Sequence, residues 1–157
     1  MLDALNEHAS KKENKKDKNA LWIVKPGENS NRGCGIEVFK KLDQIKIHIE
    51  KEKQRHPERT FIIQKYLNPF LYHRRKFDIR CYLLVTATPQ IRAYYYPIGY
   101  IRTSSCEFTT KNCSNKFIHL TNDAIQKKQT EYGKYEKGNK VTYEEFQKYL
   151  DLFESKR

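Results

Sequence analysis

The sequence predicts an α+β fold in which an antiparallel sheet is flanked by helices. Two strand-like segments, 77–86 and 91–96, are separated by the turn sequence Thr-Pro-Gln at 88–90, a pattern typical of a β-hairpin. Segments 42–55 and 143–153 carry apolar residues at helical spacing. Helices mixed with strands around an antiparallel hairpin indicate the α+β class.

The first elements along the chain are a lead-in, a strand and a helix. Residues 1–20 are polar, rich in Lys and Asn and without apolar periodicity, which is typical of a flexible lead-in. The apolar run 21–24 is followed by Lys-Pro-Gly, which predicts a buried strand that ends in a turn. The isoleucines of 42–55 fit both a helix and an alternating strand, and the length and charged end of the segment favour the helix.

The later elements are a strand at 61–63, the hairpin and a last helix. Thr142 stands three residues before Glu145, the spacing of a capping box that opens a helix. One face of this helix is predicted to carry the apolar residues Phe146, Leu150 and Phe153.

Size and charge limit the classes of function. The chain has 157 residues, the size of one domain or a piece of one, and a net charge of +12. Most of the excess lies in 21–102, which holds 16 basic and 7 acidic side chains. A concentrated positive field attracts nucleic acid, nucleotide phosphates or acidic protein tails. A basic protein with solvated lysines remains the alternative.

The apolar segments indicate where the protein is located, and the spacing of the cysteines indicates whether it binds zinc. No segment approaches the roughly 18 apolar residues of a membrane span, and no signal peptide is visible, so we expect a soluble, intracellular protein and no membrane partner. The four cysteines form no CxxC pair, which makes a zinc site improbable and predicts free thiols: Cys34, Cys81, Cys106 and Cys113.

Three charged residues alternate in the strand that begins the hairpin. The period of two places Lys76, Asp78 and Arg80 on one face. Burying an unpaired ion costs several kcal/mol, so these side chains must face water, each other or a charged ligand. For this segment alone, a solvated face with an ion-pair ladder ranks ahead of a ligand site.

The glycine-punctuated loop 27–35 invites a phosphate-binding interpretation. Five residues separate Gly27 from Gly33, and Cys34 follows, so the loop matches neither a P-loop nor a dinucleotide fingerprint. It leaves a loop after a strand, with Lys25 at its base, Arg32 within it, and glycines that let backbone N–H groups approach an anion. An ordinary surface hairpin is the alternative for this loop taken alone.

Several segments occur together in one order: WIVKPGENSNRGCGI, QKYL, RRKFDIR, GYIRTSS, HLTNDAIQK, and YGKYEKGN followed by YEEFQKYL. This set resembles the tubulin-tyrosine ligase-like family of ATP-grasp ligases. The resemblance covers 21 to about 150 and implies an ATP-grasp-like fold with central and partial C-terminal subdomains. Residues 21–153 would form this partial domain, and 154–157 a tail.

The resemblance also implies roles for individual residues. Lys25 and Lys76 would neutralise ATP phosphates beneath a loop that contains Arg32 and Gly33. Asp78 would lie near the nucleotide. The adenine edge would pair with the backbone of Gln64, Lys65, Tyr66 and Leu67.

The polar contacts to ATP would be completed by Thr121 and Asn122, and Asp123 is a weaker candidate. Arg80 and Arg102 would act on the phosphate or on the carboxylate of the incoming amino acid, because a forked guanidinium suits that task. A structural role for His119 is preferred to that of a catalytic base.

The implied reaction joins a free amino acid, tyrosine, glutamate or glycine, to a carboxylate on an acidic protein tail, in this family typically the C-terminal tail of tubulin. ATP-grasp ligases activate the carboxylate as an acyl phosphate, with Mg²⁺ bridging the phosphates. No separate metal site on the chain is predicted. The implied location is cytoplasmic and associated with the cytoskeleton or a cilium.

Departures from the family pattern keep alternatives open. Relatives have a domain before Leu21, and after Leu150 they continue to an Asp and a Glu-x-Asn pair that hold magnesium. We therefore expect residues 1–157 alone to ligate nothing. Cys34 stands where relatives often have a basic residue. A non-catalytic tail-binding module and a nucleic-acid-binding module are the alternatives, but the latter leaves Asp78 and QKYL unexplained, so no nucleic-acid partner is expected.

Overall fold

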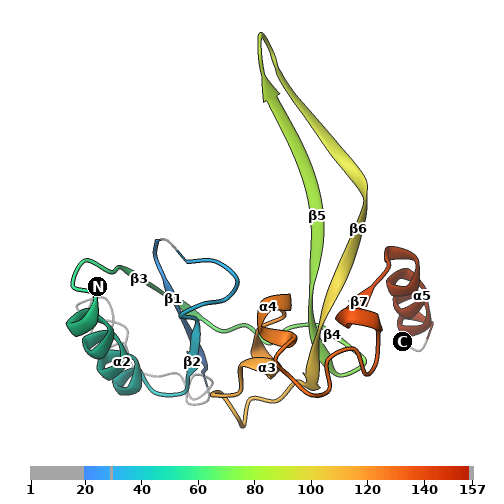
Figure 1. Cartoon of the computed structure of the whole chain (residues 1–157). Helices are drawn as coiled ribbons and strands as arrows, with labels where there is room; N and C mark the ends of the chain where they lie inside the picture. Colours follow the sequence, from blue (N-terminus) through green and yellow to red (C-terminus); the bar gives the residue numbers. More distant parts are fainter. Residues whose placement is uncertain (1–19, 29, 156–157) are drawn as a thin grey trace. The chain divides into compact units, whose positions relative to one another are not determined.

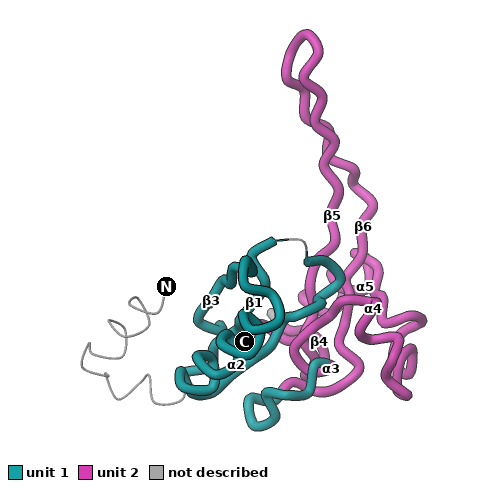
Figure 2. The backbone as a smooth tube through the Cα atoms, turned by 60° about the vertical axis from the view of Figure 1, so that its left-hand side comes forward, with its two compact units in different colours: residues 1–69, 109–116 teal, residues 70–108, 117–157 magenta. Residues whose placement is uncertain are grey.

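The computed structural model describes residues 20–28 and 30–155. The predicted lead-in, apart from its last residue, and the last two residues of the predicted tail lie outside this part. The chain divides into two compact units, one of residues 1–69 and 109–116 and the other of residues 70–108 and 117–157. Figure 1 gives the elements and Figure 2 the two units, called unit 1 and unit 2 below.

Unit 1 is a three-stranded antiparallel sheet with one helix. Its strands are β1 (Trp22–Pro26), β2 (Glu37–Phe39) and β3 (Phe61–Lys65), in the order β2-β1-β3, and its helix is α2 (Leu42–Arg55). Ile45 and Ile49 of the helix pack with β1 and β3 side chains in the core, whereas Ile47 is 52% exposed. This pattern has the period of a helix, so the helical interpretation of 42–55 is confirmed.

Unit 2 is built on a four-stranded antiparallel sheet in the order β4-β5-β6-β7. Its strands are β4 (Leu71–Tyr72), β5 (Arg75–Ala87), β6 (Ile91–Glu107) and β7 (Lys140–Val141). The helical segments are α3 (Lys116–His119), which starts at the boundary with unit 1, α4 (Asp123–Gln126), the 3₁₀ turn η2 (Lys137–Asn139) and α5 (Tyr143–Glu154). The two antiparallel sheets, together with the helices, confirm the predicted α+β class.

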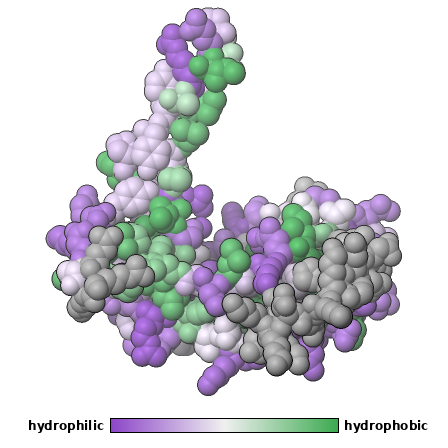
Figure 3. Space-filling view, turned by 180° about the vertical axis from the view of Figure 1, so that it is seen from behind, coloured by the Kyte–Doolittle hydropathy of each residue, from purple (hydrophilic) through white to green (hydrophobic). Residues whose placement is uncertain are grey.

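The predicted hairpin is present and longer than expected. β5 and β6 pair from Arg75 and Glu107 to Ala87 and Ile91, with irregularities near Arg75 and Arg80. Beyond the short partners β4 and β7, they continue as a two-stranded arm of residues 81–98 (Figure 1). Apolar side chains of this arm are open to solvent, with Ile91 81% exposed, and Figure 3 shows them as green patches along it.

The last helix begins as the sequence predicts. The Thr142 hydroxyl accepts a hydrogen bond from the Glu145 backbone N–H at 3.1 Å, and the Glu145 carboxylate accepts one from the Thr142 N–H at 2.9 Å. Phe146 packs at 4.9 Å from Phe77, and Phe153 at 5.2 Å from Phe70, between ring centroids. The helix therefore covers the start of the sheet with an aromatic face.

We expect Thr142→Ala to lower the free energy of unfolding by about 1 kcal/mol, because one backbone donor at the start of α5 loses its acceptor. Thr142→Ser keeps the hydroxyl and serves as the control. Urea unfolding of both variants measures the effect, and equal stability of the Ala variant and the wild type would show that the capping box contributes nothing.

Candidate functional site

In unit 1, two of the predicted site residues meet on one face of the sheet. Ile23 lies opposite Gln64 and Lys25 lies opposite Ile62, so Lys25 and Gln64 are diagonal neighbours. The Lys25 Nζ donates a hydrogen bond to the Gln64 Oε1 at 2.7 Å. This face is opposite the one that carries the core residue Val24, so it presents an ammonium and an amide side by side, suitable for an anion or a polar heterocycle.

The QKYL segment begins inside β3, whereas the sequence predicted that it follows a strand. Gln64 and Lys65 are the last residues of β3 rather than the first residues after a strand. The Tyr66 N–H then bonds to the Leu21 carbonyl at 2.7 Å, and burial, followed by the charge of Cys113, raises the pKa of Tyr66 to about 12. Leu67 is exposed.

The glycine loop between β1 and β2 contains a turn at residues 32–35. Arg32 and Gly33 have positive φ angles of 56° and 80°, and Gly35 has one of 72°. A side chain at Gly35 would place its Cβ 2.6 Å from the Pro26 ring, so this position requires glycine. A cleft of about 420 Å³ adjoins the loop and is lined by Pro26, Glu28, Ser30, Asn31, Cys34, Gly35, His56, Glu58 and Arg59.

In unit 2, Asp78 and Arg102 form an ion pair across β5 and β6. The two residues are direct partners in the strand register. The Arg102 Nη2 lies 2.6 Å from the Asp78 Oδ2, and its Nε lies 3.0 Å from the Oδ1. This hydrogen bonding, against the effect of burial, raises the pKa of Arg102. The pair is partly exposed, with 17% of the Arg102 side chain and 35% of the Asp78 side chain accessible to solvent.

Lys76 and Arg80 are the other two residues of the predicted ion-pair ladder. The Lys76 Nζ donates to the His119 carbonyl at 2.8 Å, which links β5 to α3. Arg80 is exposed. The ion-pair ladder expected within the strand is therefore replaced by a contact across strands and a contact to a helix. His119 is buried against Phe108, which fits its predicted structural role.

The HLTN segment forms the turn before α4. Thr121 is buried, and the Asn122 carbonyl accepts hydrogen bonds from the first turn of the helix. Burial acts to raise the pKa of Asp123, but hydrogen bonds from Lys127 and Tyr132 outweigh it, so this pKa lies below its usual value. Asp123 is thus held by its neighbours Tyr132 and Lys127.

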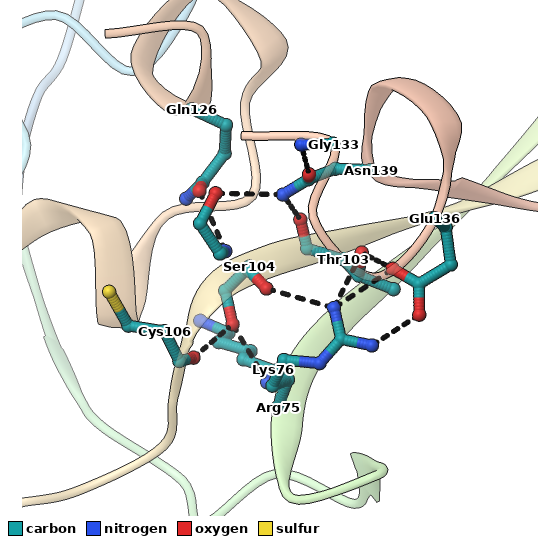
Figure 4. A network of polar contacts seen from close by, with 10 residues as sticks. Arg75, Lys76, Thr103, Ser104, Cys106, Gln126, Gly133, Glu136 and Asn139 are labelled. Carbon is teal, nitrogen blue, oxygen red and sulfur yellow. Dashed lines mark hydrogen bonds and ion pairs between the residues drawn. The ribbon is translucent and has the colours of Figure 1, made fainter. Parts of the chain in front are cut away.

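A buried ion pair that the sequence reasoning missed lies next to these residues (Figure 4). Arg75 is 2% exposed and forms two hydrogen bonds with the Glu136 carboxylate, one of them 2.9 Å long. The Thr103 hydroxyl donates to the same carboxylate at 2.9 Å. The centroid of the Tyr135 ring lies 4.3 Å from the Arg75 guanidinium carbon. In the sequence, Arg75 and Glu136 are marked only by their presence in two of the motif segments, RRKFDIR and YGKYEKGN.

Two buried amides extend this network. The Asn139 Nδ2 donates to the Thr103 carbonyl at 3.0 Å and to the Ser105 hydroxyl at 2.9 Å. The Gln126 Oε1 accepts from the Ser105 N–H at 2.8 Å, and its Nε2 donates to the carbonyls of Phe117 and Leu120. Both amides therefore tie β6 to the segments that follow it, Asn139 as a donor and Gln126 as an acceptor that also donates to the segment before α4.

A cleft of about 800 Å³ opens beside the ion pair. Its walls combine two acidic residues with several basic and aromatic ones: Tyr72, His73, Arg75, Tyr135, Glu136, Lys137, Lys140 and Glu145. Arg75 and Glu136 already neutralise each other, and Glu145 caps α5. The cleft is thus bordered by lysines whose charge is not used in these contacts.

The predicted site residues fall into two groups. The first group lies in unit 1 and consists of Lys25, Arg32, Gly33, Gln64, Lys65, Tyr66 and Leu67. The second lies in unit 2 and consists of Lys76, Asp78, Arg80, Arg102, Thr121 and Asn122. The structure brings Lys25 to Gln64 and Asp78 to Arg102. That both groups face one nucleotide stays a prediction.

Comparison with known proteins decides the family. The model of the tubulin-tyrosine ligase family matches residues 1–157. The chain belongs to this family. A tubulin glycylase, 3D of Tetrahymena thermophila, is 41% identical over 141 residues, which is 87% of this chain and 13% of that protein.

Two further members of the tubulin-tyrosine ligase family show the same relation. A tubulin monoglutamylase of Mus musculus is 40% identical over 71% of this chain and 9% of its own length. A probable alpha-tubulin polyglutamylase of Tetrahymena thermophila is 36% identical over 85% of this chain and 34% of its own length. The chain thus spans between 9% and 34% of the length of these relatives.

In residues 20–28 and 30–155, no group of three or more His, Cys, Asp or Glu is arranged to hold a metal ion. No helix within the same part is long and apolar enough to cross a membrane.

Proposed function

We propose that this chain forms part of an ATP-dependent ligase that joins tyrosine, glutamate or glycine to a carboxylate on an acidic protein tail, such as that of tubulin. The observation that carries the proposal is the family match over the whole chain. It is supported by relatives whose names describe a tubulin glycylase and a tubulin monoglutamylase. Such a protein would associate with the cytoskeleton or a cilium in the cytoplasm.

The residues of unit 1 fit the recognition of ATP. The Lys25 ammonium would contact the phosphates, and the backbone of Gln64–Leu67 would pair with the adenine edge. The hydrogen bond from Lys25 to Gln64 orients both side chains before a ligand arrives. Gly33 and the neighbouring Arg32 would close over the phosphates, since positive φ angles direct successive N–H groups of such a loop toward an anion.

The residues of unit 2 fit charge stabilisation during group transfer. Lys76 would contact the phosphates, Thr121 and Asn122 would contact ATP, and Arg80 would contact the phosphate or the amino-acid carboxylate. Arg102 would bind the same carboxylate or phosphate, and Asp78 holds its guanidinium in a fixed direction. A preorganised cation is worth more than a mobile one, because its orientation is fixed before the reaction.

The proposed chemistry has two steps. The acceptor carboxylate attacks the γ-phosphorus of ATP and forms an acyl phosphate as ADP leaves. The amine of the amino acid then attacks the acyl carbon, phosphate leaves, and the nitrogen loses a proton as the amide forms. Mg²⁺ brought in with ATP would offset the charge of its phosphates.

Transfer of a labelled amino acid tests this function. The full-length protein that contains these residues is incubated with Mg-ATP, tubulin and radiolabelled tyrosine, glutamate or glycine in separate reactions. ATP-dependent label on tubulin, lost when the acidic tails are removed, is the expected result. Tail binding without label would favour the non-catalytic module, and salt-sensitive RNA binding without saturable ATP binding would favour the nucleic-acid alternative.

A further inference from the structure

The buried network of unit 2 consists of Arg75, Thr103, Gln126, Glu136 and Asn139. Several of its members are next to, or bonded next to, the predicted ligand-contacting residues of that unit. Arg75 directly precedes Lys76, and Thr103 directly follows Arg102. Gln126 bonds to the carbonyl of Leu120, the residue before Thr121. Figure 4 shows Arg75, Lys76, Thr103 and Gln126 of this set from close by. The network therefore restrains the backbone on which those side chains are mounted.

The Arg75 guanidinium is used entirely inside the protein. Its Nη1 lies 3.3 Å from the Ser104 carbonyl as well as near Glu136, and the Lys76 N–H donates to the Ser104 hydroxyl at 3.1 Å. Adjacent strand residues point to opposite faces, so Arg75 and Lys76 leave β5 in opposite directions. One residue anchors the strand and the next carries the predicted ligand contact.

Stability alone does not account for an ion pair at this place. Replacing a buried ion pair with apolar residues of similar volume is often neutral or even stabilising. A bidentate pair differs from an apolar contact in fixing distance and direction at both ends. Here the two ends are β5 and the segment before η2, with β6 held to the same carboxylate through Thr103.

We propose that Arg75 and Glu136 are positioning residues whose pairing sets the direction of Lys76 and Arg102. The proposal rests on the proposed function, since it assigns the pair to the same ligase site. In this role Arg75 and Glu136 would act through their neighbours in the chain and not by contact with the nucleotide or the amino acid. They act through the register of β5 against β6 and through the loop that leads into η2.

The decisive variant is Arg75→Met combined with Glu136→Leu in the full-length protein. It removes both charges together and leaves apolar side chains in the buried space. We expect a thermal midpoint close to that of the wild type, with kcat lower by about 100-fold, because small displacements of reacting groups have effects of that order. KM for ATP is measured together with kcat, and the direct ATP dissociation constant is measured separately.

The neighbouring exposed pair supplies a matched control. Arg74 and Glu107 lie 3.0 Å apart, with side chains 80% and 55% exposed. Arg74→Met combined with Glu107→Leu should leave kcat, KM and the thermal midpoint unchanged. Wild-type kcat in the stable Arg75/Glu136 double variant would overturn the positioning role and leave the ligase function intact.

A milder variant covers the case in which the double variant does not fold. Thr103→Val removes the hydroxyl that donates to Glu136 while keeping the shape of the side chain. It should lower kcat more than it raises KM, and unchanged kinetics would overturn the proposal. If the wild-type protein neither binds ATP nor transfers an amino acid, the proposed function itself is wrong, and the positioning role is overturned with it.

Discussion

Glu136→Ala is expected to lower the free energy of unfolding by about 3–5 kcal/mol, the range for breaking a buried ion pair from one side. The substitution leaves the Arg75 guanidinium buried without its counter-ion. The Thr103 hydroxyl loses the same acceptor. Urea unfolding of the purified protein measures the difference.

The control for this prediction is the residue beside Arg75. Arg74 carries the same side chain and pairs with Glu107, but both are exposed to solvent. Arg74→Ala should therefore change the free energy of unfolding by no more than about 1 kcal/mol. Similar losses for Glu136→Ala and Arg74→Ala would contradict the account of the buried network.

Arg102→Ala should reduce amino-acid transfer by the full-length protein by about 100-fold to 1,000-fold, the effect of removing one preorganised donor. ATP affinity should fall far less, because Lys25 and Lys76 remain to contact the phosphates. The Asp78 carboxylate would also lose all three of its hydrogen bonds to Arg102. Single-turnover transfer and equilibrium ATP binding separate the two effects.

Two further variants define the role of Arg102. Arg102→Lys keeps the charge but loses the fork, so transfer should remain well below the wild-type level. Arg92→Ala changes an exposed arginine on the arm and should leave transfer unaltered. If Arg102→Ala weakens ATP binding as much as it weakens transfer, the residue is a phosphate ligand instead.

The elements that the sequence predicts correctly have strong local signals. The hairpin has two long β-rich segments and a short turn, and α5 has a capping box visible in four residues. The strands β2, β4 and β7 have only two or three residues each, too few to show a period of two. Strand ends were also misplaced at β3 and β6, because pairing with a neighbour extends a strand beyond its apolar core.

In the candidate site, the sequence predicts the residues but not the contacts between them. Lys25, Gln64, Lys76, Asp78 and Arg102 follow from ordered motifs and from the resemblance they carry. The contacts of Lys25 with Gln64 and of Asp78 with Arg102 depend on strand register, which no single segment contains.

The burial of Arg75 could not be predicted from the sequence. Charged side chains are almost never fully buried unless paired, and its partner Glu136 is 61 residues away in the sequence. Nothing near Arg75 in the sequence marks it as different from Arg74. Only the folded unit distinguishes the two.

Lysine labelling by an acyl-phosphate derivative of ATP tests the central claim most directly, namely that Lys25 and Lys76 contact the phosphates of one nucleotide. Such a reagent acylates amines that lie against the phosphates of the bound nucleotide. In the full-length protein, we predict that peptides containing Lys25 and Lys76 are acylated and that excess Mg-ATP protects both. Lys137, which borders the 800 Å³ cleft of unit 2, should show no protection by ATP. Protection of neither Lys25 nor Lys76, or protection confined to Lys137, would contradict the account.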